Sequence, residues 1–160
     1  MKTIKKQAIL DELKLRVQKD LTQAKSAFKS TKGHATDSEL KSDGKYDTRS
    51  IEAGYLAGAQ KKRVDELELE LGLLDEININ HLPSEVSVGS LAEIEFNKMK
   101  RLYFISSTSG GTMLEIEGET ILVISAFSPI GAAAIGLSVG DTFEVETATN
   151  TREYTILSIG

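Results

Sequence analysis

Two apolar stripes at helical spacing, separated by a polar and acidic stretch, constrain the fold of this chain most. From Ile4 to about Lys32 the sequence contains no Gly or Pro, and a second stripe runs to about Ile77. The stripes recur mainly at intervals of three and four residues, through Leu10, Leu13, Val17, Leu21, Ala24 and Phe28, and through Ala53, Ala57, Val64, Leu67, Leu71 and Leu74. Because each stripe is narrow and the remaining faces are polar, they predict an antiparallel coiled-coil hairpin over residues 1–80.

The apolar content of the predicted second helix changes along its length. This helix is expected to begin between Gly44 and Ile51, and small residues, among them Gly54 and Gly58, follow its start. The segment 67–74, which reads Leu-Glu-Leu-Glu-Leu-Gly-Leu-Leu, is far more apolar. The gradient predicts a hairpin that is anchored at its base and looser toward its tip.

The tip itself, near residues 33–48, is acidic. Its carboxylates are Asp37, Glu39, Asp43 and Asp47. Carboxylate oxygens suit Mg²⁺, which takes one or two carboxylates from a protein and completes its shell with water and substrate phosphates. The tip is therefore a candidate to complete a metal site in another protein. Plainer roles stay open, because Thr36-x-x-Glu39 matches a helix capping box and Asp43 or Asp47 suits the N-cap of the second helix.

After Pro83 the pattern changes from helical spacing to alternation, which predicts a second domain over residues 84–160. About six short strands are expected, at 92–96, 102–105, 114–116, 121–124, 143–145 and 154–159. Between the fourth and fifth, Ser128 suits an N-cap, Pro129 the first helical position and Gly136 the residue after the last turn. The expected class is α+β, with a mostly antiparallel sheet and one short helix.

Charge and composition exclude several function classes. The net charge is −5, and residues 81–160 contain four basic against ten acidic residues. This balance argues against direct binding to a nucleic-acid duplex, which requires basic residues to neutralise phosphates. The chain has no cysteine, and no apolar run approaches the roughly 20 residues that span a bilayer. We expect a cytoplasmic protein.

The sequence offers no self-contained catalytic centre. Its histidines are His34, in the tip, and His81, at the predicted domain junction. No serine-hydrolase, zinc-protease or phosphate-loop motif is present. Gly110-Gly111 lacks the Lys-Ser/Thr that a phosphate loop requires, and we interpret it as a turn. We therefore expect an accessory protein without a cofactor of its own.

The order of these features resembles a known family. A helical hairpin precedes a domain that carries Tyr103-Phe-Ile, Gly110-Gly, Ser128-Pro-Ile-Gly and Val139-Gly-Asp. This arrangement is similar to the Gre family of bacterial transcription elongation (transcript-cleavage) factors, and to divergent Gre-like members in particular. The resemblance implies an FKBP-like second domain that docks on RNA polymerase, with Phe127, Ser128 and Pro129 as candidate contacts. It also implies a hairpin that enters the secondary channel and promotes cleavage of backtracked RNA.

By this resemblance, the tip would approach the catalytic Mg²⁺ of the polymerase through Glu39 and Asp43, with Asp37 and Asp47 as second candidates. Glu39 occupies the first acidic position of the family's tip motif. Ser42 stands at the second acidic position, and Asp43 follows one residue later. The departure leaves open an alternative, a channel-binding regulator that does not stimulate cleavage.

Two alternatives come from other classes. A structural coiled-coil dimerisation protein would use Leu67, Leu71 and Leu74, whereas the polymerase hypothesis expects a monomer. An FKBP-like fold also suggests a peptidyl-prolyl isomerase. Such a pocket needs an aromatic lining, and the domain has no Trp and only these aromatic residues: Phe96, Tyr103, Phe104, Phe127, Phe143 and Tyr154.

Overall fold

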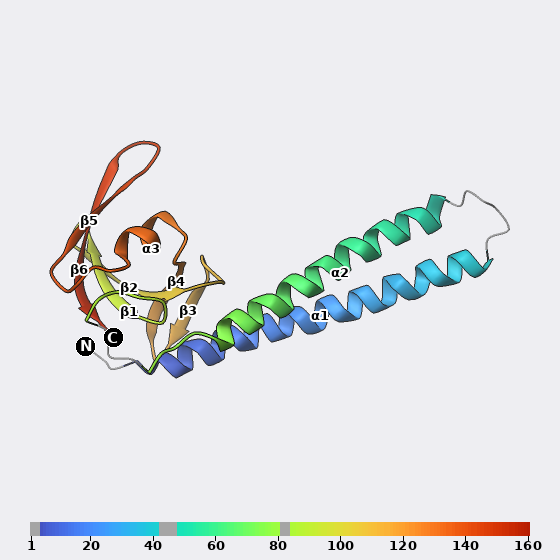
Figure 1. The fold of residues 1–160 in the computed structure, drawn as a ribbon, viewed down its shortest axis with the longest axis horizontal. Coiled ribbons are helices and arrows are strands. Elements are labelled where there is room, and N and C mark those ends of the chain that lie inside the picture. Colours follow the sequence, from blue (N-terminus) through green and yellow to red (C-terminus); the bar gives the residue numbers. More distant parts are fainter. Residues whose placement is uncertain (1–3, 42–47, 81–83) are drawn as a thin grey trace. The chain divides into compact units, whose positions relative to one another are not determined.

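The computed structural model describes residues 4–41, 48–80 and 84–160, without the side chains of residues 33–50 and 53 (Figure 1). The chain divides into two compact units. One unit is Lys14–Gly72, and the other combines the residues up to Leu13 with Leu73–Gly160. The domain boundary predicted near residues 81–83 lies outside the described residues.

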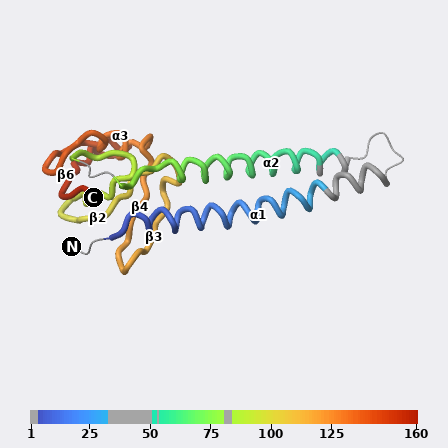
Figure 2. The backbone as a smooth tube through the Cα atoms, turned by 60° about the horizontal axis from the view of Figure 1, so that its bottom comes forward, coloured from blue at the N-terminus to red at the C-terminus, as the bar shows by residue number. Residues whose placement is uncertain are grey.

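Two long helices form the predicted antiparallel hairpin. They are α1 (Lys6–Lys41) and α2 (Thr48–Asp75), and they run side by side in both Figure 1 and Figure 2. Within Lys14–Gly72 the predicted stripes supply the buried residues, which are Val17, Leu21, Val64 and Leu67. The Lys25 ammonium lies 3.4 Å from a carboxylate oxygen of Glu68 across the pair.

Burial along the hairpin follows the predicted gradient. Leu67 is 1% exposed, whereas the stripe residues nearer the tip are half-buried, namely Ala24, Phe28 and Ala57. The end of α1 differs from the prediction, because the helix continues to Lys41 instead of ending near Lys32. A single glycine, Gly33, costs only about 1 kcal/mol in a helix and so does not by itself end one. Thr36 therefore lies inside α1 and does not cap the start of a helix.

The second domain is a six-stranded mixed sheet with one short helix. The strands are β1 (Leu91–Phe96), β2 (Met99–Ser106), β3 (Met113–Ile116), β4 (Glu119–Ser125), β5 (Thr142–Glu146) and β6 (Thr151–Ile159), and the helix is α3 (Pro129–Ala134). Their order across the sheet is β3-β4-β2-β1-β6-β5. Only β2 and β4 pair in parallel, so the sheet is mostly antiparallel. The predicted α+β class is confirmed.

Alternation along the strands gives the sheet two apolar faces. One face packs with Ala134 of α3 in a core that includes Ile94, Ile105, Phe143 and Ile156. Residues of opposite parity, Leu102, Phe104, Leu114, Ile121 and Val123, are also buried. The same compact unit contains the helix ends with buried Ile9, Leu13 and Leu74. Because both faces of the sheet are buried, β2 is apolar continuously from Leu102 to Ile105 instead of alternating.

Tight turns join neighbouring strands of the sheet. Glu117 (φ 54°) and Gly118 (φ 81°) form the two-residue turn between β3 and β4, with the left-handed backbone that such hairpins require. In the final hairpin, the Thr147 amide donates to the Asn150 carbonyl oxygen at 2.7 Å. These turns set the pairing of neighbouring strands.

Candidate docking site

The connection from β4 to α3 holds Phe127, Ser128 and Pro129, the predicted docking residues. Ser128 is the N-cap of α3, and its hydroxyl accepts a hydrogen bond of 3.1 Å from the Gly131 amide. Pro129 occupies the first turn, where the missing amide hydrogen costs nothing. Ser128 is therefore the N-cap that the sequence predicts.

Ser125, the last residue of β4, holds the same connection from the other side. Its carbonyl oxygen accepts from the Ser128 hydroxyl at 2.6 Å and from the Ser128 amide at 3.0 Å. Its hydroxyl accepts from the Phe127 amide at 3.1 Å. A Cβ atom added at Gly131 would collide with the Ser125 carbonyl oxygen. The backbone on both sides of Phe127 is thus fixed by short-range hydrogen bonds.

The Phe127 side chain points into solvent from this fixed backbone and is 85% exposed. Ile135, at the C-cap of α3, is 39% exposed, and Val139, in the following turn, is 58% exposed. One stretch of the chain contributes all three side chains, Phe127, Ile135 and Val139. Aromatic side chains are enriched at interfaces, so Phe127 is the candidate anchor among the three. Sequence reasoning missed Ile135 and Val139, although an apolar residue directly before Gly140-Asp141 was an available signal.

The acidic candidates of the tip lie in a part of the chain whose side chains are outside the described structure. Asp37 and Glu39 fall on the backbone of α1, but their side chains are outside the described part of the chain. Asp43 and Asp47 lie outside the described residues altogether. Their role stays a prediction. In the described part of the chain, no helix combines the length and apolarity needed to cross a membrane.

Four of the six aromatic residues of the sheet domain come together on the face that carries α3. The Phe96 and Tyr154 rings lie 5.1 Å apart and those of Phe143 and Tyr154 lie 5.2 Å apart, while Tyr103 joins the same core. Burial raises the pKa of Tyr103, and the neighbouring Tyr154 raises it further, against an opposing effect of Arg101 and Arg152. Phe104 is buried on the opposite face.

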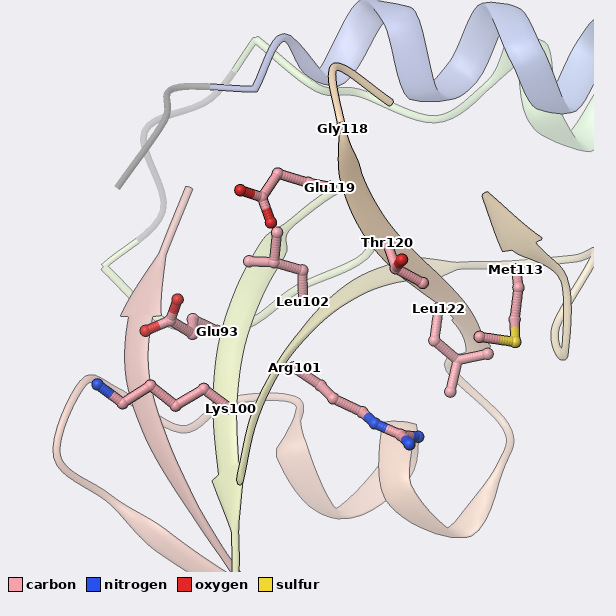
Figure 3. Close-up of a pocket in the computed structure, with 9 residues that line it drawn as sticks. All are labelled: Glu93, Lys100, Arg101, Leu102, Met113, Gly118, Glu119, Thr120 and Leu122. Carbon is pink, nitrogen blue, oxygen red and sulfur yellow. The ribbon is translucent and has the colours of Figure 1, made fainter. Parts of the chain in front are cut away.

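A separate cavity of about 470 Å³ lies at the start of β2 and β4 (Figure 3). Glu93, Glu119 and Lys100 line it together with Arg101, whose side chain points away from that of Lys100 and toward Leu122. Both signs of charge line this cavity, and none of the residues predicted for docking contributes to it.

The chain combines a helical hairpin with a mixed sheet, and its β4–α3 loop presents the exposed Phe127 side chain on a hydrogen-bonded backbone. These features are typical of a protein that binds a partner protein. Comparison with known proteins identifies the family. The family model described as the C-terminal part of transcription elongation factor GreA/GreB matches residues 81–160, half of the chain. The protein belongs to the GreA/GreB family of transcription elongation factors.

Solved structures of similar proteins were also found. GreA factor homolog 1 (Gfh1) of Thermus thermophilus is 21% identical, with 92% of this chain and 94% of that chain covered and a TM-score of 0.37. Gfh1 of Thermus aquaticus is 20% identical, with 90% and 91% covered and a TM-score of 0.40. A GreA/GreB factor of Nitrosomonas europaea is 21% identical, with 60% and 78% covered and a TM-score of 0.37. A search of curated proteins found no significant match.

Proposed function

We propose that this protein is a cytoplasmic, monomeric accessory factor that binds RNA polymerase. Its sheet domain docks on the enzyme, and its hairpin enters the secondary channel to modulate or stimulate cleavage of backtracked RNA. Membership of the GreA/GreB family supports the partner. The observation that carries the docking role is Phe127, an aromatic side chain that is 85% exposed on a hydrogen-bonded loop.

The docking mode follows from the preorganisation of this loop. A loop backbone that is already held by hydrogen bonds loses little conformational freedom on binding, so more of the burial energy of its side chain appears as affinity. Aromatic residues that enter a pocket on a partner commonly dominate an interface. Phe127 would be such an anchor, and Ser128 and Pro129 would hold its backbone.

The tip is proposed to act through Glu39 and Asp43, with Asp37 and Asp47 as second candidates. Carboxylates are the donors that Mg²⁺ prefers, so the residue types fit a metal that belongs to the polymerase. When bound in a phosphodiesterase centre, such an ion activates the attacking water. The catalytic power would remain that of the polymerase, with this chain as an accessory.

Ser42 favours a second candidate function. It stands at the family's second acidic tip position, where a hydroxyl cannot replace the charge of a carboxylate. A protein with this substitution could occupy the channel without completing the metal site. Nucleic acid would in both cases be met through the polymerase.

The test is RNA cleavage in a stalled, backtracked complex of the cognate polymerase, with binding measured in parallel. Wild-type protein is compared with Glu39→Ala/Asp43→Ala and with Phe127→Ser. Cleavage that the tip variant loses while it still binds would support the metal role. The matched control for the tip is Glu115→Ala/Glu144→Ala, which removes two exposed carboxylates from the sheet domain.

The docking role has its own control, Met113→Ser, at another exposed apolar side chain of the domain. We expect Phe127→Ser to weaken polymerase binding at least tenfold, which corresponds to about 1.4 kcal/mol, and Met113→Ser to change it little. Binding without cleavage by the wild-type protein would leave the channel regulator. Absence of binding would overturn the proposed function.

A further inference from the structure

A small pocket in the sheet domain is built from the ends of three strands and lies away from Phe127 in the sequence. It has a volume of about 140 Å³. Its lining residues are Phe96, Met99, Arg101, Tyr103, Arg152 and Tyr154. Pockets for drug-sized ligands measure about 300–1,000 Å³, so this one suits a single side chain.

The floor of the pocket is aromatic and well supported. Tyr103 and Tyr154 are 5% and 3% exposed and belong to the core beneath the pocket. The Phe96 ring packs against Tyr154, which in turn stacks on Phe143. Because these rings are held by the core, the floor is preformed and does not need to be ordered when a ligand binds.

Two guanidinium groups give the pocket a positive charge. Arg152 lies over the Phe96 ring, 5.2 Å from its centroid, and Arg101 approaches the Tyr103 hydroxyl. No carboxylate is among the lining residues, and neither arginine is ion-paired with a carboxylate in the part of the chain that the structure describes. A guanidinium binds a carboxylate through paired hydrogen bonds, and its stacking on an aromatic ring orients it for this contact.

We propose that this pocket binds a short segment of another protein in which one apolar side chain is flanked by carboxylates. The apolar side chain would fill the aromatic floor, and the carboxylates would pair with Arg101 and Arg152. The charge of the site and that of the segment are complementary, although the domain as a whole is acidic. This proposal does not depend on polymerase docking through Phe127.

The observations favour a peptide over a nucleic acid. Base stacking needs an open ring face, but Tyr103 and Tyr154 are buried and Arg152 already covers a face of Phe96. Residues 81–160 also contain ten acidic against four basic residues, which repels a phosphate backbone. A segment with two carboxylates brings far less negative charge than an oligonucleotide.

The experiment titrates the ¹⁵N-labelled full-length protein with synthetic pentapeptides and follows its amide resonances. The main probe is acetyl-Ser-Asp-Phe-Asp-Ser-amide. One comparison peptide replaces both Asp with Lys, and another replaces the central Phe with Ser. We expect the first to shift the resonances of Phe96, Tyr103 and Tyr154, and the other two to bind at least tenfold more weakly, since each lacks one of the two kinds of contact.

The variants Arg101→Gln and Arg152→Gln keep the side chains long and polar while removing their charge. Each is expected to weaken binding of the Asp-Phe-Asp peptide about tenfold. The matched control is Lys100→Gln. Lys100 precedes Arg101 in the sequence, but its side chain points away from that of Arg101 and lines the cavity of about 470 Å³ (Figure 3). Loss of affinity in the arginine variants alone, with the amide spectrum of the fold preserved, would support the proposal.

Several results would overturn it. These are absence of binding, equal binding of the Lys-flanked peptide, or an equal effect of Lys100→Gln. Tighter binding of a single-stranded RNA oligonucleotide to the same residues would assign the pocket to nucleic acid. Concentration-dependent shifts of these resonances without peptide would assign it to a second copy of the chain, and turnover of a proline-centred peptide would assign it to prolyl isomerisation.

Discussion

The Ser128 hydroxyl donates a hydrogen bond of 2.6 Å to the Ser125 carbonyl oxygen, which ties the N-cap of α3 to the end of β4. The same hydroxyl accepts from the Gly131 amide. One side chain therefore closes the loop that presents Phe127 and also starts the helix that follows.

Replacing this hydroxyl should destabilise the domain. Ser128→Ala removes both hydrogen bonds, and we expect a loss of about 1–2 kcal/mol in the free energy of unfolding. Urea denaturation followed by circular dichroism measures it. Ser128→Thr retains the hydroxyl and should lose markedly less, so equal losses in the two variants would contradict the role of the hydrogen bonds.

Two glycine-to-alanine variants should shift stability in opposite directions. At Gly131 the added methyl group would collide with the Ser125 carbonyl oxygen, whereas at Gly72, in α2, it meets nothing within 4 Å. We expect Gly131→Ala to destabilise, and Gly72→Ala to stabilise by about 0.5–1 kcal/mol because alanine favours a helix. Thermal denaturation compares them, and stabilisation by both would refute the close approach at Gly131.

A buried amide oxygen in the hairpin offers a stabilising variant. The Oε1 atom of Gln60 is buried and has no hydrogen-bond partner among the described residues. Gln60→Leu removes this unpaired acceptor at similar volume, and we expect about 1 kcal/mol of added stability in urea denaturation. Gln60→Glu, which places a charge at the same position, should destabilise. A less stable Leu variant would show that the amide makes a favourable contact.

The buried hydroxyl of Tyr103 should make stability fall in alkali. Burial raises its pKa above the usual value of 10.0, so the folded protein holds the proton to a higher pH than the unfolded chain does. The stabilisation is complete below that usual value and is lost as the pH rises through the pKa of the folded state. Tyr103→Phe should therefore reduce the alkaline decline in the urea midpoint. Tyr55→Phe, at an exposed position, is the matched control, and identical declines in the wild type and Tyr103→Phe would contradict this effect.

Much of the fold was predictable because its signals are local. Apolar spacing predicted both long helices, alternation predicted the strands, and Ser128, Pro129 and Gly136 predicted the limits of α3. The end of α1 was predicted too early, since a single glycine does not by itself end a helix. The tip acids Glu39 and Asp43 remain candidates by sequence alone, because their side chains lie outside the described residues.

The sequence by itself determined which segments are helices and strands, since capping, turn chemistry and side-chain periodicity act between near neighbours. Only the tertiary structure decided the strand order, including the parallel pairing of β2 with β4. It also brought Phe96, Arg101 and Arg152 from three strands to one pocket and left Phe127 in solvent. These outcomes depend on contacts between residues far apart in the chain, which no local pattern encodes.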